Sequence, residues 1–307
     1  MEIHFAPMQG YTDQTYRRRH AAMFDGITYY YTPFIRIEKG EPRRQDLRRI
    51  DDHEENAGVP LIPQIIFGDV TEFRTLTEAV SDAGYDRIDL NIGCPFPMQM
   101  HRGRGCQLMA EPDILAAVAE AMKEYPDIAF SLKMRAGIES PDEWEKIVDI
   151  INGMPLTHVT MHPRTARDKY SGPLHPEAFR GMTERCRHRL VYNGDLATPE
   201  DVAAIAAEYP SIDAVMTGRG LLARPSLAEE IATGRTWSEE EQRDALVALN
   251  EGIMEEYAET LCGDAQLLAK LKPLWEYAEP LIGRKIWKAI HKAGTMKVYI
   301  AAVAKIR

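Results

Sequence analysis

Cys94 and Lys133 are the residues of this sequence best suited to moving a proton or holding an anion. Cys94 follows an apolar run and stands between Gly93 and Pro95. An unperturbed thiol has a pKa of about 8.5, so it is mostly protonated near neutrality and can act as an acid. Lys133 ends another apolar run, where an unpaired ammonium is costly to bury. A small buried hydrophobe and a paired structural lysine are the plainer alternatives.

The other candidate site residues share one position, because each lies in or at the end of a short apolar run. A structural explanation exists for each of them alone, such as a turn at Asn193-Gly194 or a hydrogen-bonded core histidine. A glycine turn with an arginine can instead present backbone N–H groups to a phosphate. Together they predict a single site; they are Pro7, Met8, Gln64, Asn91, Arg135, His162, Asn193, Gly194, Asp195, Gly218 and Arg219.

Eight short apolar runs alternate with helical patterns over the first 235 residues. This alternation predicts an α/β fold, a (β/α)8 TIM barrel, in which function gathers at the carboxyl ends of the strands. A doubly wound sheet is the alternative, but no GxGxxG motif follows the first run. We expect strands at Ile3–Met8, Thr28–Phe34, Leu61–Phe67, Arg87–Ile92, Ile128–Met134, His158–His162, Leu190–Asn193 and Ala214–Thr217.

Capping residues predict where several helices begin. Ser140, Thr198 and Pro112 each open a helical pattern with an N-cap or a first-turn proline. Residues 36–58 are polar and lack periodicity, which predicts a loop-rich insertion with one short helix. The glycine-rich segment 102–105 is interpreted as a mobile lid over the site.

The composition changes at Ser238, which begins a capping box with Glu241. Only helical patterns follow, with breaks near Gly263 and at residues 280–283. We therefore expect two domains: a catalytic barrel over residues 1–235 and an all-helical domain over residues 238–307.

The net charge of −10 argues at first against a nucleic-acid partner. The charge is uneven, however, because residues 265–307 hold nine basic side chains against two acidic ones. This segment carries about +7 and the rest of the chain about −17. A local basic surface can bind RNA on an acidic protein, although a merely solvated helix face is the alternative.

The four cysteines form no CxxC pair, so neither a disulfide framework nor a zinc site is expected. Cys106, Cys186 and Cys262 are interpreted as small buried hydrophobes. The sequence shows no signal peptide and no long apolar segment, which predicts a cytoplasmic protein without membrane contact. We also expect a monomer.

The motifs at the strand ends resemble those of the tRNA-dihydrouridine synthases in order and spacing. The resemblance covers nearly the whole chain and is most specific at the Asn-x-Gly-Cys-Pro loop. The matching segments are Ala6-Pro7-Met8, Asn91-Ile92-Gly93-Cys94-Pro95, Gly103–Met109, Ser131–Gly137, His162-Pro163-Arg164-Thr165, Tyr170-Ser171-Gly172, Asn193-Gly194-Asp195, Thr217–Gly220 and Leu271–Trp275.

This resemblance implies FMN in the barrel, NADPH as reductant and tRNA as substrate. Hydride then reaches uracil C6 while Cys94 protonates C5, and Asn91, Arg135 and Arg164 contact the nucleotide. The implied FMN contacts are Pro7, Met8, Gln64, Lys133, His162, Asn193, Gly194, Asp195, Gly218 and Arg219.

Three segments depart from the family pattern: Thr32-Pro33-Phe34, Pro163 after His162, and the apolar loop Phe96–Met100. These departures leave open which uridine is reduced and whether the RNA is transfer or ribosomal. Two further alternatives are a small-molecule flavin enzyme of the dihydroorotate dehydrogenase type and a non-catalytic RNA-binding barrel. The basic tail argues against the first, and the combination of Cys94, Lys133 and His162 against the second.

Overall fold

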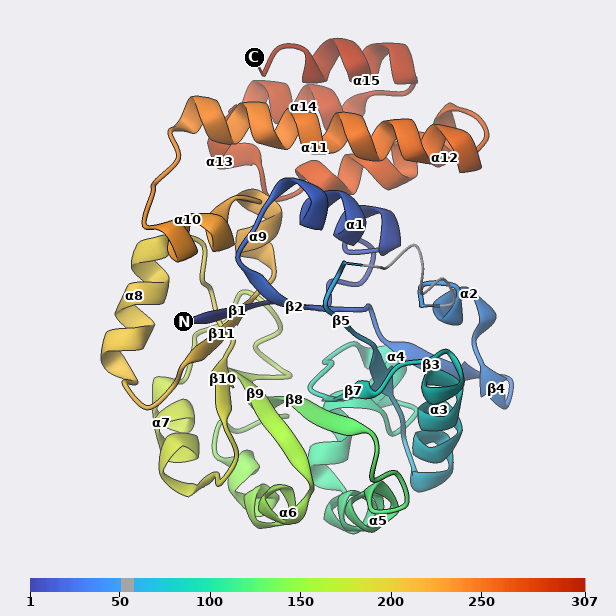
Figure 1. The fold of residues 1–307 in the computed structure, drawn as a ribbon, viewed down its shortest axis with the longest axis vertical. Coiled ribbons are helices and arrows are strands. Elements are labelled where there is room, and N and C mark those ends of the chain that lie inside the picture. Colours follow the sequence, from blue (N-terminus) through green and yellow to red (C-terminus); the bar gives the residue numbers. More distant parts are fainter. Residues whose placement is uncertain (51–57, 307) are drawn as a thin grey trace.

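A ring of parallel strands forms the centre of the molecule. The computed structural model describes residues 1–50 and 58–306. The strands of the ring curl around one axis, with helices on the outside (Figure 1). They are β1 (Glu2–Phe5), β2 (Ile27–Tyr31), β5 (Leu61–Ile62) with β6 (Gln64–Ile66), β7 (Arg87–Ile92), β8 (Ala129–Gly137), β9 (Leu156–Thr165), β10 (Leu190–Tyr192) and β11 (Ala214–Thr217).

The ring closes on both sides of β1, which pairs in parallel with β11 and with β2. The third predicted strand is split at Pro63, which has no N–H to donate. Its first part, β5, pairs with β2, and its second part, β6, pairs with β7. The strand order then runs from β7 to β11 without a crossover. The (β/α)8 barrel is thus confirmed, and the doubly wound alternative is wrong.

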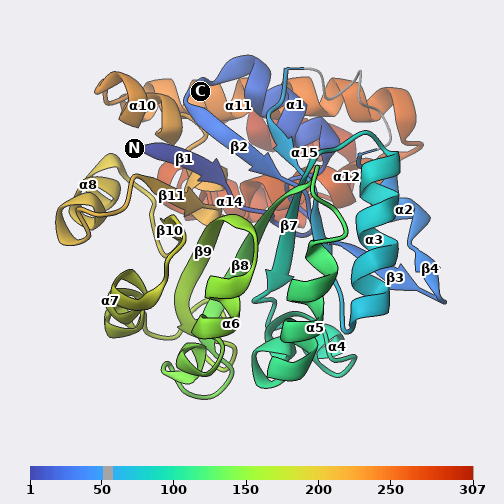
Figure 2. The same cartoon turned by 60° about the horizontal axis from the view of Figure 1, so that its bottom comes forward.

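Helices cover the outside of the ring, as the view in Figure 2 also shows. The predicted starts at Pro112 and Thr198 are confirmed, the latter with a complete capping box. The start at Ser140 is wrong, because the Glu143 carboxylate accepts from the N–H groups of Ile138 and Glu139 and only a 3-10 turn follows. These helices are α1 (Gln14–Met23), α3 (Val70–Asp82), α5 (Pro112–Met122), α6 (Val148–Gly153), α7 (Pro176–Arg185), α8 (Pro199–Glu208), α9 (Arg219–Ala223) and α10 (Leu227–Thr233).

The insertion after β2 holds more structure than its sequence predicts. The expected short helix is α2 (Arg44–Leu47). A hairpin of β3 (Ile35–Glu38) and β4 (Glu41–Pro42) precedes it, and β3 adds to the sheet beside β6. Part of the predicted insertion, residues 51–57, lies outside the described residues.

The C-terminal segment is helical, and the predicted break near Gly263 is confirmed. Its helices are α11 (Glu239–Thr260), α12 (Asp264–Leu271), α13 (Glu279–Ile282), α14 (Arg284–Lys292) and α15 (Met296–Val303). The second predicted break, at residues 280–283, is wrong in extent, because residues 280–282 lie in α13 and only Gly283 interrupts the helices there. Figure 1 shows α11 lying across α1. Glu256 of α11 pairs there with Arg18 and Arg19 of α1. Among the described residues, no helix is long and apolar enough to cross a membrane.

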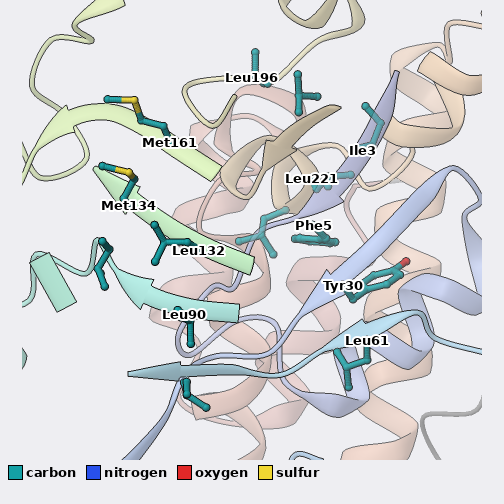
Figure 3. Close-up of a cluster of buried hydrophobic side chains, with 14 of the residues drawn as sticks. Ile3, Phe5, Tyr30, Leu61, Leu90, Leu132, Met134, Met161, Leu196 and Leu221 are labelled. Carbon is teal, nitrogen blue, oxygen red and sulfur yellow. The ribbon is translucent and has the colours of Figure 1, made fainter. Parts of the chain in front are cut away.

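One hydrophobic cluster joins the barrel's outer face to the C-terminal helices. Side chains such as Phe5, Leu90 and Leu132 point outward from the strands (Figure 3). Leu246 and Ile253 of α11 belong to the same cluster. Because the two parts share this core, the division at residues 235–238 stays a prediction.

Candidate active site

A set of polar side chains points into the barrel, because successive side chains along each strand alternate between its two faces. Asp89 and Asn91 of β7 face Ser131 and Lys133 of β8 in register. Gln64 of β6 pairs in register with Asp89. Since successive side chains of a strand point to opposite faces, these residues share the inner face while Leu90 and Leu132 point outward. The inner face is therefore polar at the level where the site is predicted.

A buried carboxylate anchors the lower part of this polar set. Asp89 accepts hydrogen bonds from Gln64 Nε2 at 2.7 Å and from Ser131 Oγ at 2.7 Å. Burial raises the pKa of Asp89 to about 6, and both hydrogen bonds oppose the shift. Gln64 in turn accepts at Oε1 from Asn91 Nδ2 at 2.8 Å. The chain of contacts fixes the amide of Asn91 in one orientation.

Asn91 uses its side-chain oxygen to shape the loop that carries Cys94. Its Oδ1 accepts from the backbone N–H of Gly93 at 3.1 Å and of Cys94 at 2.9 Å. Arg135 Nε donates to the Gly93 carbonyl at 3.0 Å from the other side. Asn91 and Arg135 therefore position the cysteine loop, and their predicted contacts with a nucleotide stay predictions.

The thiol of Cys94 is partly exposed, whereas that of Cys106 is fully buried. Burial raises the pKa of Cys94, while the Phe96 backbone N–H and the cations Arg135 and Lys133 lower it. The net shift is upward, so the thiol stays protonated at neutral pH. Cys106 faces the Gly137 carbonyl at 3.4 Å, as expected for a structural cysteine. The expectation for Cys262 is wrong, because it is exposed after α11.

Lys133 places a cation near the carboxyl end of β8. Its Nζ donates to Asn193 Oδ1 at 2.7 Å, and Asn193 Nδ2 donates to the Met216 carbonyl at 2.7 Å. Lys133 thus donates to a neutral amide. Burial, together with repulsion from Arg135, lowers the pKa of Lys133 to about 8.

A second cationic group lies at the ends of β9, β10 and β11. Arg164 donates hydrogen bonds from its two terminal guanidinium nitrogens to Asp195. Arg219 donates to the same carboxylate at 2.6 Å. Asp195 adopts a φ of 45°, in the left-handed region. Arg164 also faces His162 Nε2 at 3.3 Å. Burial and the surrounding cations keep the pKa of His162 well below its usual range, so the ring is neutral.

Pro7 and Met8 follow β1 and border the turn after β11. A Cβ on Gly218 would lie 2.6 Å from Met8 Sδ, which explains the glycine as a close approach. Met8 is fixed by its backbone N–H, which donates to Thr12 Oγ1 at 3.0 Å. Gly194 precedes the left-handed Asp195 and lies against Leu174 and the Tyr192 hydroxyl.

The glycine-rich segment 102–105 is anchored by several contacts in this conformation, and its interpretation as a mobile lid stays a prediction. Arg104 is buried and pairs with the Glu72 carboxylate through Nε at 2.8 Å and through a second nitrogen. The Cys106 N–H donates to the Cys94 carbonyl at 3.0 Å. A Cβ on Gly105 would lie 2.7 Å from that carbonyl. The segment therefore supports the Cys94 loop from behind.

The structure thus gathers most predicted site residues at one end of the barrel and adds several that the sequence analysis did not single out. Asp89 could have been found as a charged residue inside an apolar run. Glu72 lies on a helix and carries no such signal. Among the described residues, no three His, Cys, Asp or Glu side chains gather as a metal site.

Comparison with known proteins agrees with this geometry. The dihydrouridine synthase family profile matches residues 4–298. The chain belongs to the dihydrouridine synthase family. It is therefore an enzyme of an FMN-dependent oxidoreductase family, as the strand-end motifs predict.

Several relatives and solved structures are similar to the chain. The tRNA-dihydrouridine(16) synthase of Pseudomonas syringae pv. tomato is 30% identical over 254 residues, which cover 78% of this chain and 80% of that protein. The tRNA-dihydrouridine synthase B of Escherichia coli K12 is 26% identical, covering 74% and 70%. Morphinone reductase shares the fold with a TM-score of 0.53 at 14% identity, covering 77% and 87%. Histamine dehydrogenase from Rhizobium sp. 4-9 has a TM-score of 0.55 at 15% identity, covering 83% and 48%.

Proposed function

We propose that this protein reduces uridine in tRNA to 5,6-dihydrouridine, with FMN bound at the strand ends and NADPH as the reductant. One observation carries the proposal. A protonated, partly exposed thiol in the loop after β7 and a partly buried ammonium on β8 lie at the same end of the barrel. The reaction is inferred from membership of the family, and tRNA is inferred as the substrate because the relatives are tRNA-dihydrouridine synthases.

The charges at the strand ends fit an anionic cofactor. Lys133, Arg164 and Arg219 bring three cations to this end. Asp195 pairs with Arg164 and Arg219, whereas Lys133 donates to the neutral amide of Asn193. The Lys133 ammonium suits the N1/O2 edge of a flavin, where negative charge develops on reduction. Arg219, just after β11, is suited to a phosphate, and Arg164 is proposed to contact the nucleotide. FMN, when bound, supplies the hydride that reaches uracil C6.

Cys94 is proposed as the acid that protonates uracil C5. Negative charge develops at C5 and O4 as hydride reaches C6, and a proton must quench it. Burial keeps the thiol protonated, and Asn91 and Arg135 hold its loop. A paired uridine cannot present its face to this site, so the base must leave its stack.

The C-terminal helices supply a surface for RNA. Lys285, Lys288 and Lys292 are exposed and lie three and four residues apart on α14, so they share one face. A small-molecule flavin enzyme needs no such face, which favours the RNA substrate over the dihydroorotate dehydrogenase alternative.

Replacement of Cys94 tests the proposed acid. Cys94→Ala is expected to keep its bound flavin and lose dihydrouridine formation by about 10²–10⁴-fold, as typical for a removed acid. Cys106→Ala is the matched control, since that thiol is buried and faces a backbone carbonyl. Dihydrouridine in a reacted tRNA transcript is measured by mass spectrometry. A fully active Cys94→Ala, or an inactive but folded Cys106→Ala, would show that the acid is another group.

Neutralising the α14 face tests the RNA surface. Replacing Lys285, Lys288 and Lys292 by Gln should weaken tRNA binding and flatten its dependence on salt, because fewer counterions are released. Flavin content should stay the same. Affinity is measured by fluorescence anisotropy at several salt concentrations, and an unchanged slope would show that these lysines only solvate the helix.

A further inference from the structure

The loop after Cys94 exposes apolar side chains beside the proposed site. Phe96 is 55% exposed and Met98 is 59% exposed, and both belong to the few large hydrophobic residues with exposed side chains. Phe96 precedes α4 (Pro97–Met100), and Figure 2 places α4 just beyond the arrowhead of β7. Exposed apolar groups that lie together beside a site indicate a surface that is covered by a partner.

A cation, Arg102, follows these apolar groups in the same segment. Residues 90–110 contain no Asp or Glu in a chain whose net charge is −10. His101 and Arg102 follow α4 and are exposed. We call Phe96, Pro97, Met98, His101 and Arg102 the 96–102 surface; all five are exposed. Apolar faces for bases beside a cation for phosphate are what a single nucleic-acid strand requires.

The backbone beneath the 96–102 surface is held in place. The Phe96 carbonyl accepts from the N–H groups of Gln99 and Met100, at 2.9 and 3.1 Å. The Gln99 carbonyl accepts from those of Arg102 and Arg104, both at 3.0 Å. The buried Arg104–Glu72 pair fixes the end of the segment. A surface ordered before binding loses less conformational entropy when a ligand covers it.

We propose that the 96–102 surface binds the RNA strand next to the target uridine. Phe96 and Met98 contact the neighbouring bases or riboses, and Arg102 contacts a phosphate. This inference rests on the proposed function, since it takes the RNA as substrate. It adds to the α14 face a second contact, close to Cys94.

Two matched pairs of variants in the FMN-loaded protein test the proposal. Met98→Ser is compared with Met23→Ser, since Met23 is also exposed but lies at the end of α1 that leads into β2, away from the strand ends. Arg102→Ala is compared with Arg187→Ala, an exposed arginine just before β10. Affinity for an unmodified tRNA transcript is measured by fluorescence anisotropy, with melting temperature and flavin content as checks of folding.

Met98→Ser is expected to weaken RNA binding by about 3- to 10-fold, the range for losing an apolar contact that covers part of a methionine side chain. Arg102→Ala should also lower the salt slope of binding by about one. Both control variants should bind as the wild type does. If all four variants bound the transcript with the affinity of the wild type, the proposal would be overturned. A change of oligomeric state in Met98→Ser would instead assign the surface to a second copy of the chain. A wild type that binds the transcript without forming dihydrouridine would refute the proposed function while leaving this contact standing.

Discussion

At the scale of single residues, Lys133 shows how the barrel tunes a functional group. Its ammonium is surrounded by protein, repelled by Arg135 and bonded to the neutral amide of Asn193. These conditions lower its pKa to about 8 and favour an anion beside it. The sequence identified the residue, because a lysine in an apolar run is unusual. It gave no indication that Asn193 would be its partner, since 60 residues separate them.

The affinity of the FMN-free protein for FMN is therefore expected to fall as the pH rises through about 8. A lysine is charged below its pKa, so the attraction for an anionic cofactor is present at lower pH and lost above it. Lys133→Met should bind FMN about 10- to 100-fold more weakly, the range for a hydrogen bond to a charged group, and should show no such step. Lys123→Met, at the exposed residue that follows α5, is the control. Flavin fluorescence gives the affinities, and a step retained in Lys133→Met would exclude this lysine as its source.

At the scale of elements, sequence patterns predicted most of the barrel. Periodicity and capping located the strands and the starts at Pro112, Thr198 and Ser238. The split third strand and the β3–β4 hairpin were missed, because they depend on which neighbour each segment meets. The polar inner face was also missed. Asp89, Ser131 and His158 satisfy one another or nearby groups only once the strands are assembled.

The sequence predicted the residues of the candidate site but not the contacts that hold them in position. Glycines at 103 and 105 suggested mobility from sequence, yet both adopt positive φ in an anchored turn. The anchor is Glu72 of α3, whose carboxylate accepts from Arg104 and from the Gly68 N–H. An ion pair between a helix and a distant loop leaves no local pattern in the sequence.

Removing this anchor should disturb the cysteine loop. Glu72→Gln leaves the buried Arg104 guanidinium without a counter-charge, which is expected to cost about 3 kcal/mol of stability. Glu124→Gln is the control, because Glu124 makes a similar two-bond pair with Arg74 on the surface, where such pairs contribute about 0–1 kcal/mol. Urea unfolding measures both. If the two variants lose the same small amount, the Arg104 pair does not hold the loop.

At the scale of the whole molecule, the barrel interior is polar at both ends. The amino ends of the strands carry a histidine–tyrosine cluster opposite the candidate site. The Tyr31 hydroxyl lies 3.1 Å from His4 Nδ1 and 2.9 Å from His158 Nε2. Burial lowers the pKa of His4 to about 4 and that of His158 to about 3. The fold thus requires both rings to be neutral.

Acid should therefore destabilise the protein in a defined window. Below about pH 6.5 the unfolded chain binds protons at these histidines, and the folded chain does not until about pH 4. Stability is full above pH 6.5 and falls as the pH drops towards 4, by an amount on the order of 3 kcal/mol per histidine. His158→Gln should flatten this fall, whereas His101→Gln on the surface should not. Melting temperatures between pH 4 and pH 7 test the sign, and a flat profile for the wild type would contradict it.

The C-terminal helices and the barrel act together in this account. The α14 face and the 96–102 surface are the two proposed RNA contacts, and Cys94 and Lys133 are the proposed reactive groups. The most direct test is to incubate the purified protein with FMN, NADPH and an unmodified tRNA transcript. The RNA is then digested, and the masses of its fragments are measured by mass spectrometry. One uridine-containing fragment is expected to gain the mass of two hydrogen atoms, and the same fragment is expected to keep its original mass when Cys94→Ala is used. A transcript whose fragments all keep their original mass, with NADPH and FMN present and the protein folded, would contradict this expectation.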